Sequence, residues 1–334
     1  MEYKQSEKGI FNETTVIEYS MKNEALEVRF LNIGGAITKI AMASDYYNEN
    51  LVLAYDRVED YFNNGCYLNT IIGRTSNRIK NGTFNLNNQQ ITVDLNDGPN
   101  NLHGGYDCLT YANFEVNPIS SGYLLTTTLP HQENGFPGNL FVKVYYTLEQ
   151  NHFKVTYEAT TDQDTIVNLT QHTYFNLSGN LKETIYNHEL QINADKIAEV
   201  DENLSFTTKL FKIKDTLFDF NKLTLINPDS KKVIPLFEQT SGYDHLYILS
   251  NRDHAVTFKH IDSNRTLKIS TTSPSMQFYA GNFLTSDLIF ENHRTGEKHL
   301  GACFETHLIP FDFESQILKP GQKYWEQTIF TFTK

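Results

Sequence analysis

Apolar and polar residues alternate with a period of two along much of this chain, and this alternation restricts its fold more than any other feature. Successive side chains of a β-strand point to opposite faces, so an alternating run can bury one face. Residues 141–148, FVKVYYTL, and 152–160, HFKVTYEAT, flank the polar residues 149–151, and together they predict a β-hairpin. The side chains expected on the buried faces are Val142, Val144, Tyr146 and Leu148, then Phe153, Val155, Tyr157 and Ala159.

Further hairpins are predicted on either side of this one, whereas helical periodicity is scarce. The segment TFNLNNQQITV (83–93) would turn at Asn87-Asn88, and HAVTFKHIDSNRTLKISTT (254–272) would turn near 262–264. Only RVEDYF (57–62) and VIPLFEQ (233–239) could hold a helical turn or two. The chain is therefore expected to be all-β, a large antiparallel β-sandwich or barrel with few short helices.

Nothing in the 334 residues marks a domain boundary. The sequence has no linker rich in Pro, Gly and Ser and no abrupt change in composition. No repeat of fixed period indicates a propeller. We therefore expect residues 1–334 to form a single domain, since large all-β units can reach considerable length.

Charge and cysteine content limit the possible partners and the compartment. A formal net charge of −12 argues against nucleic acid as a partner, because phosphates would be repelled. Cys66, Cys108 and Cys303 are too few and too scattered for a disulfide framework or a zinc site. The start of the chain lacks the pattern of a secretory signal, and no apolar run could span a membrane. We expect a cytoplasmic protein with no membrane partner.

The stretch NLTQHTYFNLSG (168–179) has several possible interpretations. Asn168 and Asn176 match the glycosylation acceptor pattern, but without a secretory signal both matches are expected to be coincidental. His172 lies among strand-forming residues. It could be a packed core histidine or a proton donor, and this stretch alone does not decide between them.

Other segments place polar side chains where a plain strand or turn would not need them. Arg78 in GRTSNRIKNGTF could be a surface charge or a fork for ligand oxygens. His103 precedes a Gly-Gly pair, and Asp244 follows a glycine in SGYDHLYILS. Glu305 stands inside the apolar segment GACFETHLIPF, where a carboxylate is costly to bury unless it is paired. Glu305 is therefore the strongest candidate for a general base.

Several kinds of chemistry have no support in the sequence. No His-x-His, HExxH or two-His-plus-carboxylate spacing indicates a metal site. Phosphate-binding loops and the GxSxG elbow of serine hydrolases are also absent. A metal site is therefore not expected.

Six segments, taken in order, resemble the signature segments of the aldose 1-epimerases, also called galactose mutarotases. They are GRTSNRI, GPNNLHGG, QHTYFNLSG, GYDH, SMQFYAGNF and CFET. The resemblance covers nearly the whole chain from about Leu31 onward.

This resemblance implies a fold, a reaction and a site. The fold would be one antiparallel β-sandwich with a sugar cleft on a curved sheet. The reaction would interconvert the α and β anomers of aldohexoses such as galactose and glucose and would need neither a metal nor an organic cofactor. The protein would be a monomer or homodimer. Glu305 would be the general base and His172 the general acid. The residues that would bind the sugar are Asn77, Arg78, His103, Tyr174, Asp244 and Gln277.

The chain also departs from the family pattern, which leaves alternatives open. Residues 106–114 and 306–315 differ from the commoner family segments, and this difference leaves the choice of sugar open. A relative acting on hexose 6-phosphates would need a cationic pocket, for which the candidates are Arg74, Arg265 and Arg294. A sugar-binding protein without activity is the other alternative, although such a protein should have lost Glu305 or His172.

Overall fold

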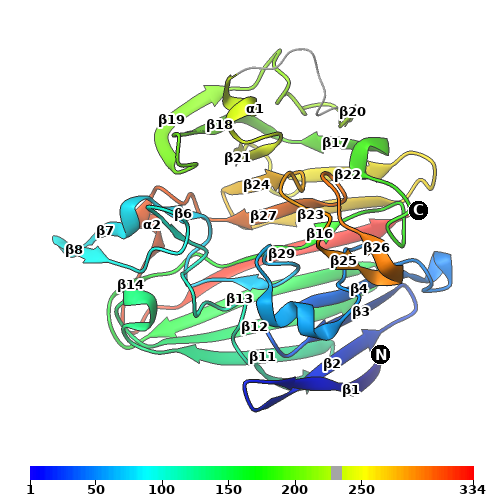
Figure 1. The fold of residues 1–334 in the computed structure, drawn as a ribbon, viewed down its shortest axis with the longest axis horizontal. Helices are drawn as coiled ribbons and strands as arrows, with labels where there is room; N and C mark the ends of the chain where they lie inside the picture. Colours follow the sequence, from blue (N-terminus) through cyan, green and yellow to red (C-terminus); the bar gives the residue numbers. More distant parts are fainter. Residues whose placement is uncertain (227–234) are drawn as a thin grey trace.

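The computed structural model describes residues 1–226 and 235–334, and antiparallel strands dominate them. The largest sheet has nine strands and runs across the molecule in Figure 1. In spatial order its strands are β10 (Glu115–Ile119), β11 (Gly122–Leu129), β12 (Leu140–Glu149), β13 (His152–Thr161), β29 (Tyr324–Thr333), β23 (Thr266–Thr271), β22 (Val256–His260), β17 (His188–Ile192) and β20 (Thr224–Leu225).

A six-stranded sheet packs against the nine-stranded sheet through aromatic side chains. Phe304 of the smaller sheet lies with its ring centroid 5.2 Å from that of Phe258 in β22, and Phe175 lies 5.5 Å from Phe330 in β29. These contacts form the centre of the core and confirm the all-β sandwich. The strands of the smaller sheet are, in order, β16 (Tyr174–Phe175), β27 (Ala302–His307), β24 (Ser275–Tyr279), β21 (Asp244–Leu249), β18 (Ala194–Val200) and β19 (Phe206–Lys212).

A third sheet of four strands begins the chain, and its strands β1 and β2 lie at the lower edge of Figure 1. Its strands are β1 (Glu2–Phe11), β2 (Thr14–Lys22), β3 (Leu26–Leu31) and β4 (Ile37–Met42). Short pairs complete the described strands: β5 (Ile71–Ile72) with β15 (Thr170–Gln171), β6 (Arg78–Ile79) with β9 (Asn101–Leu102), β7 (Thr83–Leu86) with β8 (Gln89–Thr92), β14 (Thr165–Ile166) with β28 (Ile317–Leu318), and β25 (Ile289–Phe290) with β26 (Arg294–Thr295).

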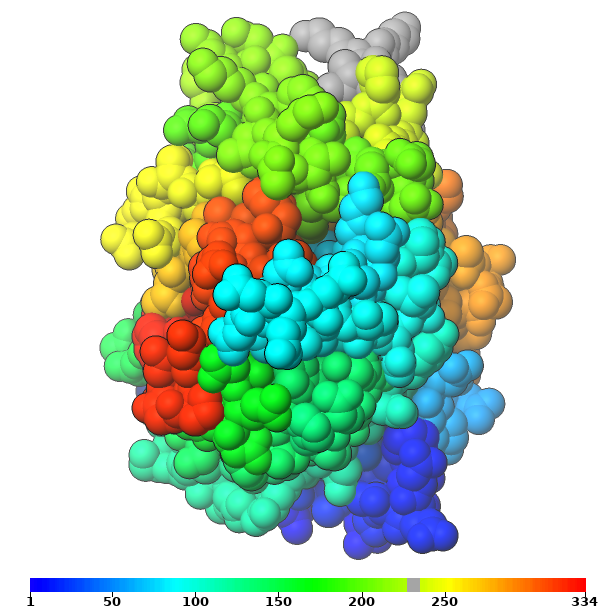
Figure 2. Space-filling model, turned by 90° about the vertical axis from the view of Figure 1, so that its left-hand side faces the viewer, coloured from blue at the N-terminus to red at the C-terminus, as the bar shows by residue number. Residues whose placement is uncertain are grey.

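The predicted hairpins are confirmed. Strands β12 and β13 pair along their whole length, and the side chains predicted to be buried are at most 3% exposed. Asn87 and Asn88 both have positive φ, as a two-residue hairpin turn requires, and they connect β7 to β8. Figure 2 shows this cyan segment beside the orange-red residues near the C-terminus, where the Phe84 and Phe313 rings stack 5.7 Å apart.

Helices are short, as predicted. RVEDYF overlaps the 3-10 helix η2 (Val58–Asn63) from its second residue onward. VIPLFEQ contains α1 (Pro235–Gln239), with residues 233 and 234 outside the described residues. The other helices of the described residues are α2 (Phe313–Gln316) and the 3-10 turns η1 (Ala43–Asp45), η3 (Lys80–Gly82), η4 (Glu133–Gly135), η5 (Ile185–Asn187) and η6 (Glu291–His293). None of the helices in these ranges has the length and apolar character needed to cross a membrane.

Arg265 is a buried arginine that connects the turn between β22 and β23 to two other loops of the molecule. Its Nε lies 2.7 Å from Asp45 Oδ2, and its Nη1 donates to the carbonyl oxygens of Leu177 and Ser178. Arg265→Ala should lower the free energy of unfolding by about 3–5 kcal/mol, because it removes the buried partner of the Asp45 carboxylate, to which the more exposed Lys334 stays paired, and a donor to two buried carbonyl groups. Urea unfolding checks this, with Arg57→Ala as the control, since that change breaks an exposed ion pair worth at most about 1 kcal/mol.

Candidate active site

A cavity of about 800 Å³ opens on the face of the six-stranded sheet that is turned away from the core. Every site residue predicted from the sequence lines it: Asn77, Arg78, His103, His172, Tyr174, Asp244, Gln277 and Glu305. These residues come from segments more than 200 positions apart in the chain. The fold therefore brings the predicted set together in one place.

Strand alternation explains which residues of the sheet reach the cavity. In β27, Phe304 packs into the core, so its neighbour Glu305 points to the opposite face. In β24, Met276 and Phe278 join the core, whereas Gln277 faces the cavity and pairs in register with Glu305. The period of two that identified the strands thus also selects the side chains that line the cavity.

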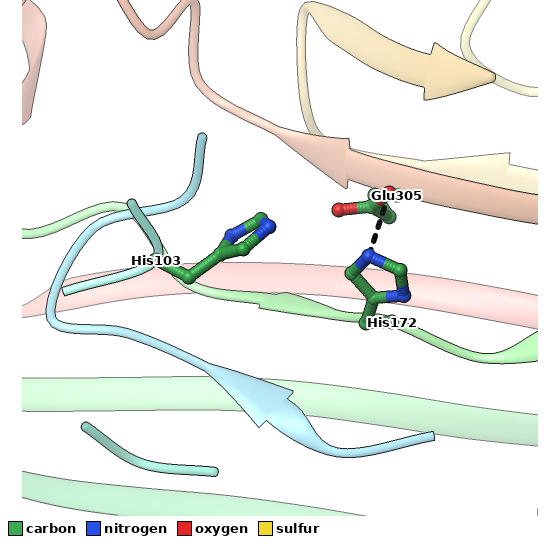
Figure 3. A group of neighbouring side chains, drawn as sticks. All are labelled: His103, His172 and Glu305. Carbon is green, nitrogen blue, oxygen red and sulfur yellow. Dashed lines mark ion pairs between the residues drawn. The ribbon is translucent and has the colours of Figure 1, made fainter. Parts of the chain in front are cut away.

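His172 lies in the short connection between β15 and β16, close to Glu305. Its backbone N–H donates to the Thr70 carbonyl, and its own carbonyl accepts from the Asn69 N–H. The imidazole Nε2 lies 3.5 Å from Glu305 Oε1, as Figure 3 shows, and the two side chains are only 7% and 3% exposed. These bonds hold the backbone of His172 in place, and its ring packs beside that of Tyr174, with 5.1 Å between the centroids.

Burial shifts the pKa values of these two groups in opposite directions. It raises the pKa of Glu305 well above its ordinary value, and the nearby Asp244 carboxyl adds to this shift while Arg78 opposes it. It lowers the pKa of His172 to about 4. At a pH above the lowered pKa of His172 and below the raised pKa of Glu305, the two groups together hold one transferable proton.

The asparagines on either side of His172 have structural roles. The Asn168 carboxamide bonds with both backbone groups of Leu308. The Asn176 carboxamide donates to the carbonyl oxygens of Glu183 and Leu300. Both asparagines are fully buried, so neither is accessible as a glycosylation acceptor in the folded chain.

His103 faces the pair from the loop after β9. Its Nδ1 lies 3.3 Å from the Asn77 backbone N–H, which can only donate, so the neutral ring carries its hydrogen on Nε2. Burial lowers the pKa of His103 well below its ordinary value, which keeps the ring neutral. Its ring centroid lies 5.5 Å from that of His172. His103 is thus arranged as an N–H donor toward the cavity.

His103, His172 and Glu305 also offer donor atoms within 4.8 Å of one another, close enough for a metal ion. A histidine that binds a metal normally donates its other ring N–H to an acceptor. The Nδ1 of His103 instead accepts a hydrogen from Asn77. The hydrogen bonding of His103 therefore favours a donor to a ligand oxygen over a metal ligand.

Other polar groups in the cavity are held in place or lack partners. Gln277 Nε2 donates to Asp244 Oδ1 at 2.6 Å, and Arg78 Nε donates to Asp97 Oδ2 at 2.6 Å. Gln277 Oε1 and Glu305 Oε2 are buried and have no hydrogen-bond partner. Unpaired buried oxygens are costly, so they mark positions where hydroxyl groups of a ligand would be favourable.

Tyr174 lines the cavity as a wall. Its hydroxyl donates to the Cys66 carbonyl, and its ring lies 5.1 Å from the His172 ring. Two further residues of the site were not predicted from the sequence. The Tyr67 ring lies 4.6 Å from that of His103, and Cys303 Sγ lies 3.6 Å from His172 Nδ1. Cys303 precedes Glu305 by two positions in β27, so strand alternation could have indicated it. Tyr67 lies in an irregular loop that carries no such signal.

Comparisons with known proteins agree with the fold. The model of the aldose 1-epimerase family matches residues 18–331. Galactose mutarotase of Bos taurus is 33% identical over 96% of this chain and 94% of its own length. Aldose 1-epimerase of Escherichia coli is 32% identical over 82% of each chain. The crystal structure of galactose 1-epimerase from Lactobacillus acidophilus superposes with a TM-score of 0.89 at 26% identity, covering 99% of this chain and 98% of that one.

The fold and the cavity, taken with these relatives, define a β-sandwich isomerase of the galactose mutarotase type. The chain belongs to the aldose 1-epimerase family. The fold class and the family predicted from the sequence are thereby confirmed.

Proposed function

We propose that this protein is an aldose 1-epimerase that interconverts the α and β anomers of aldohexoses such as galactose and glucose. The observation that carries the proposal is the buried pair in which His172 Nε2 lies 3.5 Å from Glu305 Oε1, at a polar cavity in a member of this family. A carboxyl and an imidazole so placed can act on the two oxygens bonded to one anomeric carbon.

Ring opening needs one proton removed and one delivered. Glu305 as carboxylate takes the proton of the C1 hydroxyl, and the O1–H electrons form the C1=O bond. The C1–O5 bond breaks, its electron pair goes to O5, and O5 takes a proton from protonated His172. Rotation about C1–C2 presents the other face of the aldehyde. The reverse steps then close the ring and restore both groups, so no net proton is consumed.

The pKa shifts suit this sequence of steps. Ring opening turns an ionic pair into a Glu305 carboxyl and a neutral His172, which are the forms that burial favours. The ionic pair holds the same number of protons, so only the place of one proton changes. A bound sugar with O1 donating to Glu305 and O5 accepting from His172 would stabilise the ionic form.

The remaining predicted residues would hold the sugar hydroxyls. Arg78, His103 and Asn77 offer N–H donors, whereas Asp244 and Gln277 offer oxygens. Tyr174 would form a wall against the ring. This assignment is supported by the presence of all of them along one cavity.

The alternative of a phosphosugar substrate has less support. The guanidinium group of Arg74 donates hydrogen bonds to backbone carbonyl oxygens, including those of Pro137 and Gly138. Arg265 pairs with Asp45, and Arg294 pairs with Glu297. None of these arginines lines the cavity. Its carboxyl side chains, among the described residues, are Asp56, Glu59, Asp60, Asp244, Asp287 and Glu305.

Glucose 6-phosphate should accordingly be a poor substrate. The arginines among the described lining residues, Arg57 and Arg78, each pair with a carboxylate. Placing a phosphate dianion among carboxylates is unfavourable, and we expect kcat/KM at least about tenfold lower than for glucose. Polarimetry on freshly dissolved α-anomers, corrected for the uncatalysed rate, measures this ratio. Equal values for the two sugars would favour the phosphosugar alternative.

The single domain and the cytoplasmic location are part of the same proposal. The nine-stranded sheet joins the C-terminal strand β29 to β13 and β23, which supports one folding unit. The three cysteines are free, as expected for a reducing compartment. The net charge of −12 supports a small-molecule partner over nucleic acid.

A further inference from the structure

His307 is a buried histidine on the same face of β27 as Cys303 and Glu305, and the sequence analysis gave it no role. Its Nδ1 lies 2.8 Å from the Leu308 carbonyl oxygen, and its Nε2 lies 3.1 Å from Asn77 Nδ2. It stands in the segment 306–315, which departs from the family pattern. The His307 ring therefore connects β27, the strand that carries Glu305, to Asn77 of the proposed sugar site.

These two contacts fix the hydrogen position on the ring. A carbonyl oxygen can only accept, so Nδ1 of His307 must carry the hydrogen and Nε2 must present its lone pair. Burial lowers the pKa of His307 to about 4, so the ring is neutral at ordinary pH. The Leu308 carbonyl is itself held by the Asn168 carboxamide at 3.1 Å. His307 Nε2 is thus a fixed acceptor in a known direction.

A fixed acceptor determines the orientation of the Asn77 carboxamide. Only the NH₂ group of Asn77 can face a lone pair, so Oδ1 must point elsewhere. Asn77 also has a left-handed backbone, with φ of 62°, and is only 6% exposed. The oxygen and the NH₂ group of a carboxamide have nearly the same size, so burial alone does not decide which of them faces His307. The lone pair of His307 Nε2 does decide it.

The backbone of Asn77 carries this constraint on to His103. The Asn77 N–H donates to His103 Nδ1 at 3.3 Å, and the Asn77 carbonyl accepts from the His103 N–H at 3.1 Å. The chain of bonds runs from Leu308 through His307 and Asn77 to His103. Figure 3 shows the His103 ring extending toward the side of the cavity where His172 and Glu305 lie.

We propose that His307 is a positioning residue that orients the Asn77 carboxamide and, through the Asn77 backbone, helps to keep His103 as an Nε2–H donor toward the sugar. The inference rests on the proposed function, because it gives Asn77 and His103 a sugar to bind. It makes His307 responsible for sugar affinity and leaves proton transfer to Glu305 and His172.

Substitutions at position 307 separate this role from a merely structural one. His307→Ala removes the acceptor, and we expect KM for galactose to rise about tenfold with kcat changed less than about twofold. The reason is that the lost interaction, equivalent to one hydrogen bond, stabilises the bound sugar and the transition state equally. His307→Gln should restore KM to within about threefold, because its amide oxygen can accept from Asn77 while its NH₂ donates to Leu308.

A double-mutant cycle tests the route through Asn77. If His307 acts through Asn77, adding His307→Ala to Asn77→Ala should change KM less than about twofold. Additive effects of the two changes on KM would overturn the proposal. So would a His307→Ala variant whose KM is unchanged while its thermal stability falls.

His260→Ala is the matched control, because His260 is also buried and bonded on both nitrogens but lies outside the cavity. It should lower stability and leave KM unchanged. Glu305→Gln distinguishes the two levels of inference. If that variant loses turnover while His307→Ala keeps a normal KM, only the role of His307 fails. If Glu305→Gln keeps full activity, the assignment of Glu305 as the base fails. If the unchanged protein does not interconvert the anomers of galactose or glucose, the proposed function itself fails.

Discussion

Replacing Glu305 by Gln is expected to lower kcat for anomer interconversion by about 10²–10⁴-fold, the usual contribution of a general base. The amide has nearly the same shape as the carboxyl but cannot take the O1 proton. Because Glu305 is 2% exposed and Oε2 has no partner in the protein, the neutral amide should not disturb the fold. Polarimetry with fresh α-galactose measures the loss, and calorimetry with galactose should still detect binding.

Glu326→Gln is a suitable control for that experiment. Glu326 is another buried glutamate whose pKa is raised by burial, but its carboxylate is bonded to Ser273 and Thr272, outside the cavity. This variant should keep turnover near that of the unchanged protein. Wild-type turnover in Glu305→Gln, or an equal loss in both variants, would exclude Glu305 as the base.

The alternation of apolar and polar residues made the strands predictable. Because the strands carry some of the site residues, part of the site was predictable as well. Once β27 is recognised, alternation places Phe304 in the core and Glu305 on the other face. Burying a carboxylate on an apolar strand is unfavourable unless it is paired, and this cost identified Glu305 as a candidate from the sequence alone. The same reasoning applied two positions on either side would have reached Cys303 and His307, whose contacts depend on this face.

Contacts between distant loops could not be predicted in this way. Asn77 and His307 are 230 residues apart, and their contact depends on how the loop before β6 crosses the sheet. The placement of Tyr67 against His103 is set by loops without periodicity. The grouping of Asn77, His103 and His172 was available only from the family resemblance, because no local pattern relates residues of separate loops.

The second large effect is expected at His172, where it should appear in the pH dependence as well as in the rate. His172→Gln keeps a polar amide but cannot deliver a proton to O5, so kcat should fall by about 10²–10⁴-fold. In the unchanged protein the active pair holds one proton. Activity should fall on the acid side as a second proton binds, near the lowered His172 pKa of about 4, because no base then remains.

On the alkaline side the unchanged protein should lose activity when the pair gives up its single proton, at a pH set by the raised pKa of Glu305. His172→Gln should respond in the opposite direction. Glu305 is then the only titrating member of the pair, and it can act as a base only as carboxylate, so the residual activity should increase as pH rises through its pKa. Polarimetry across pH, with circular dichroism to confirm that the fold persists, compares the two profiles. Parallel profiles for both proteins would mean that His172 and Glu305 do not share the catalytic proton.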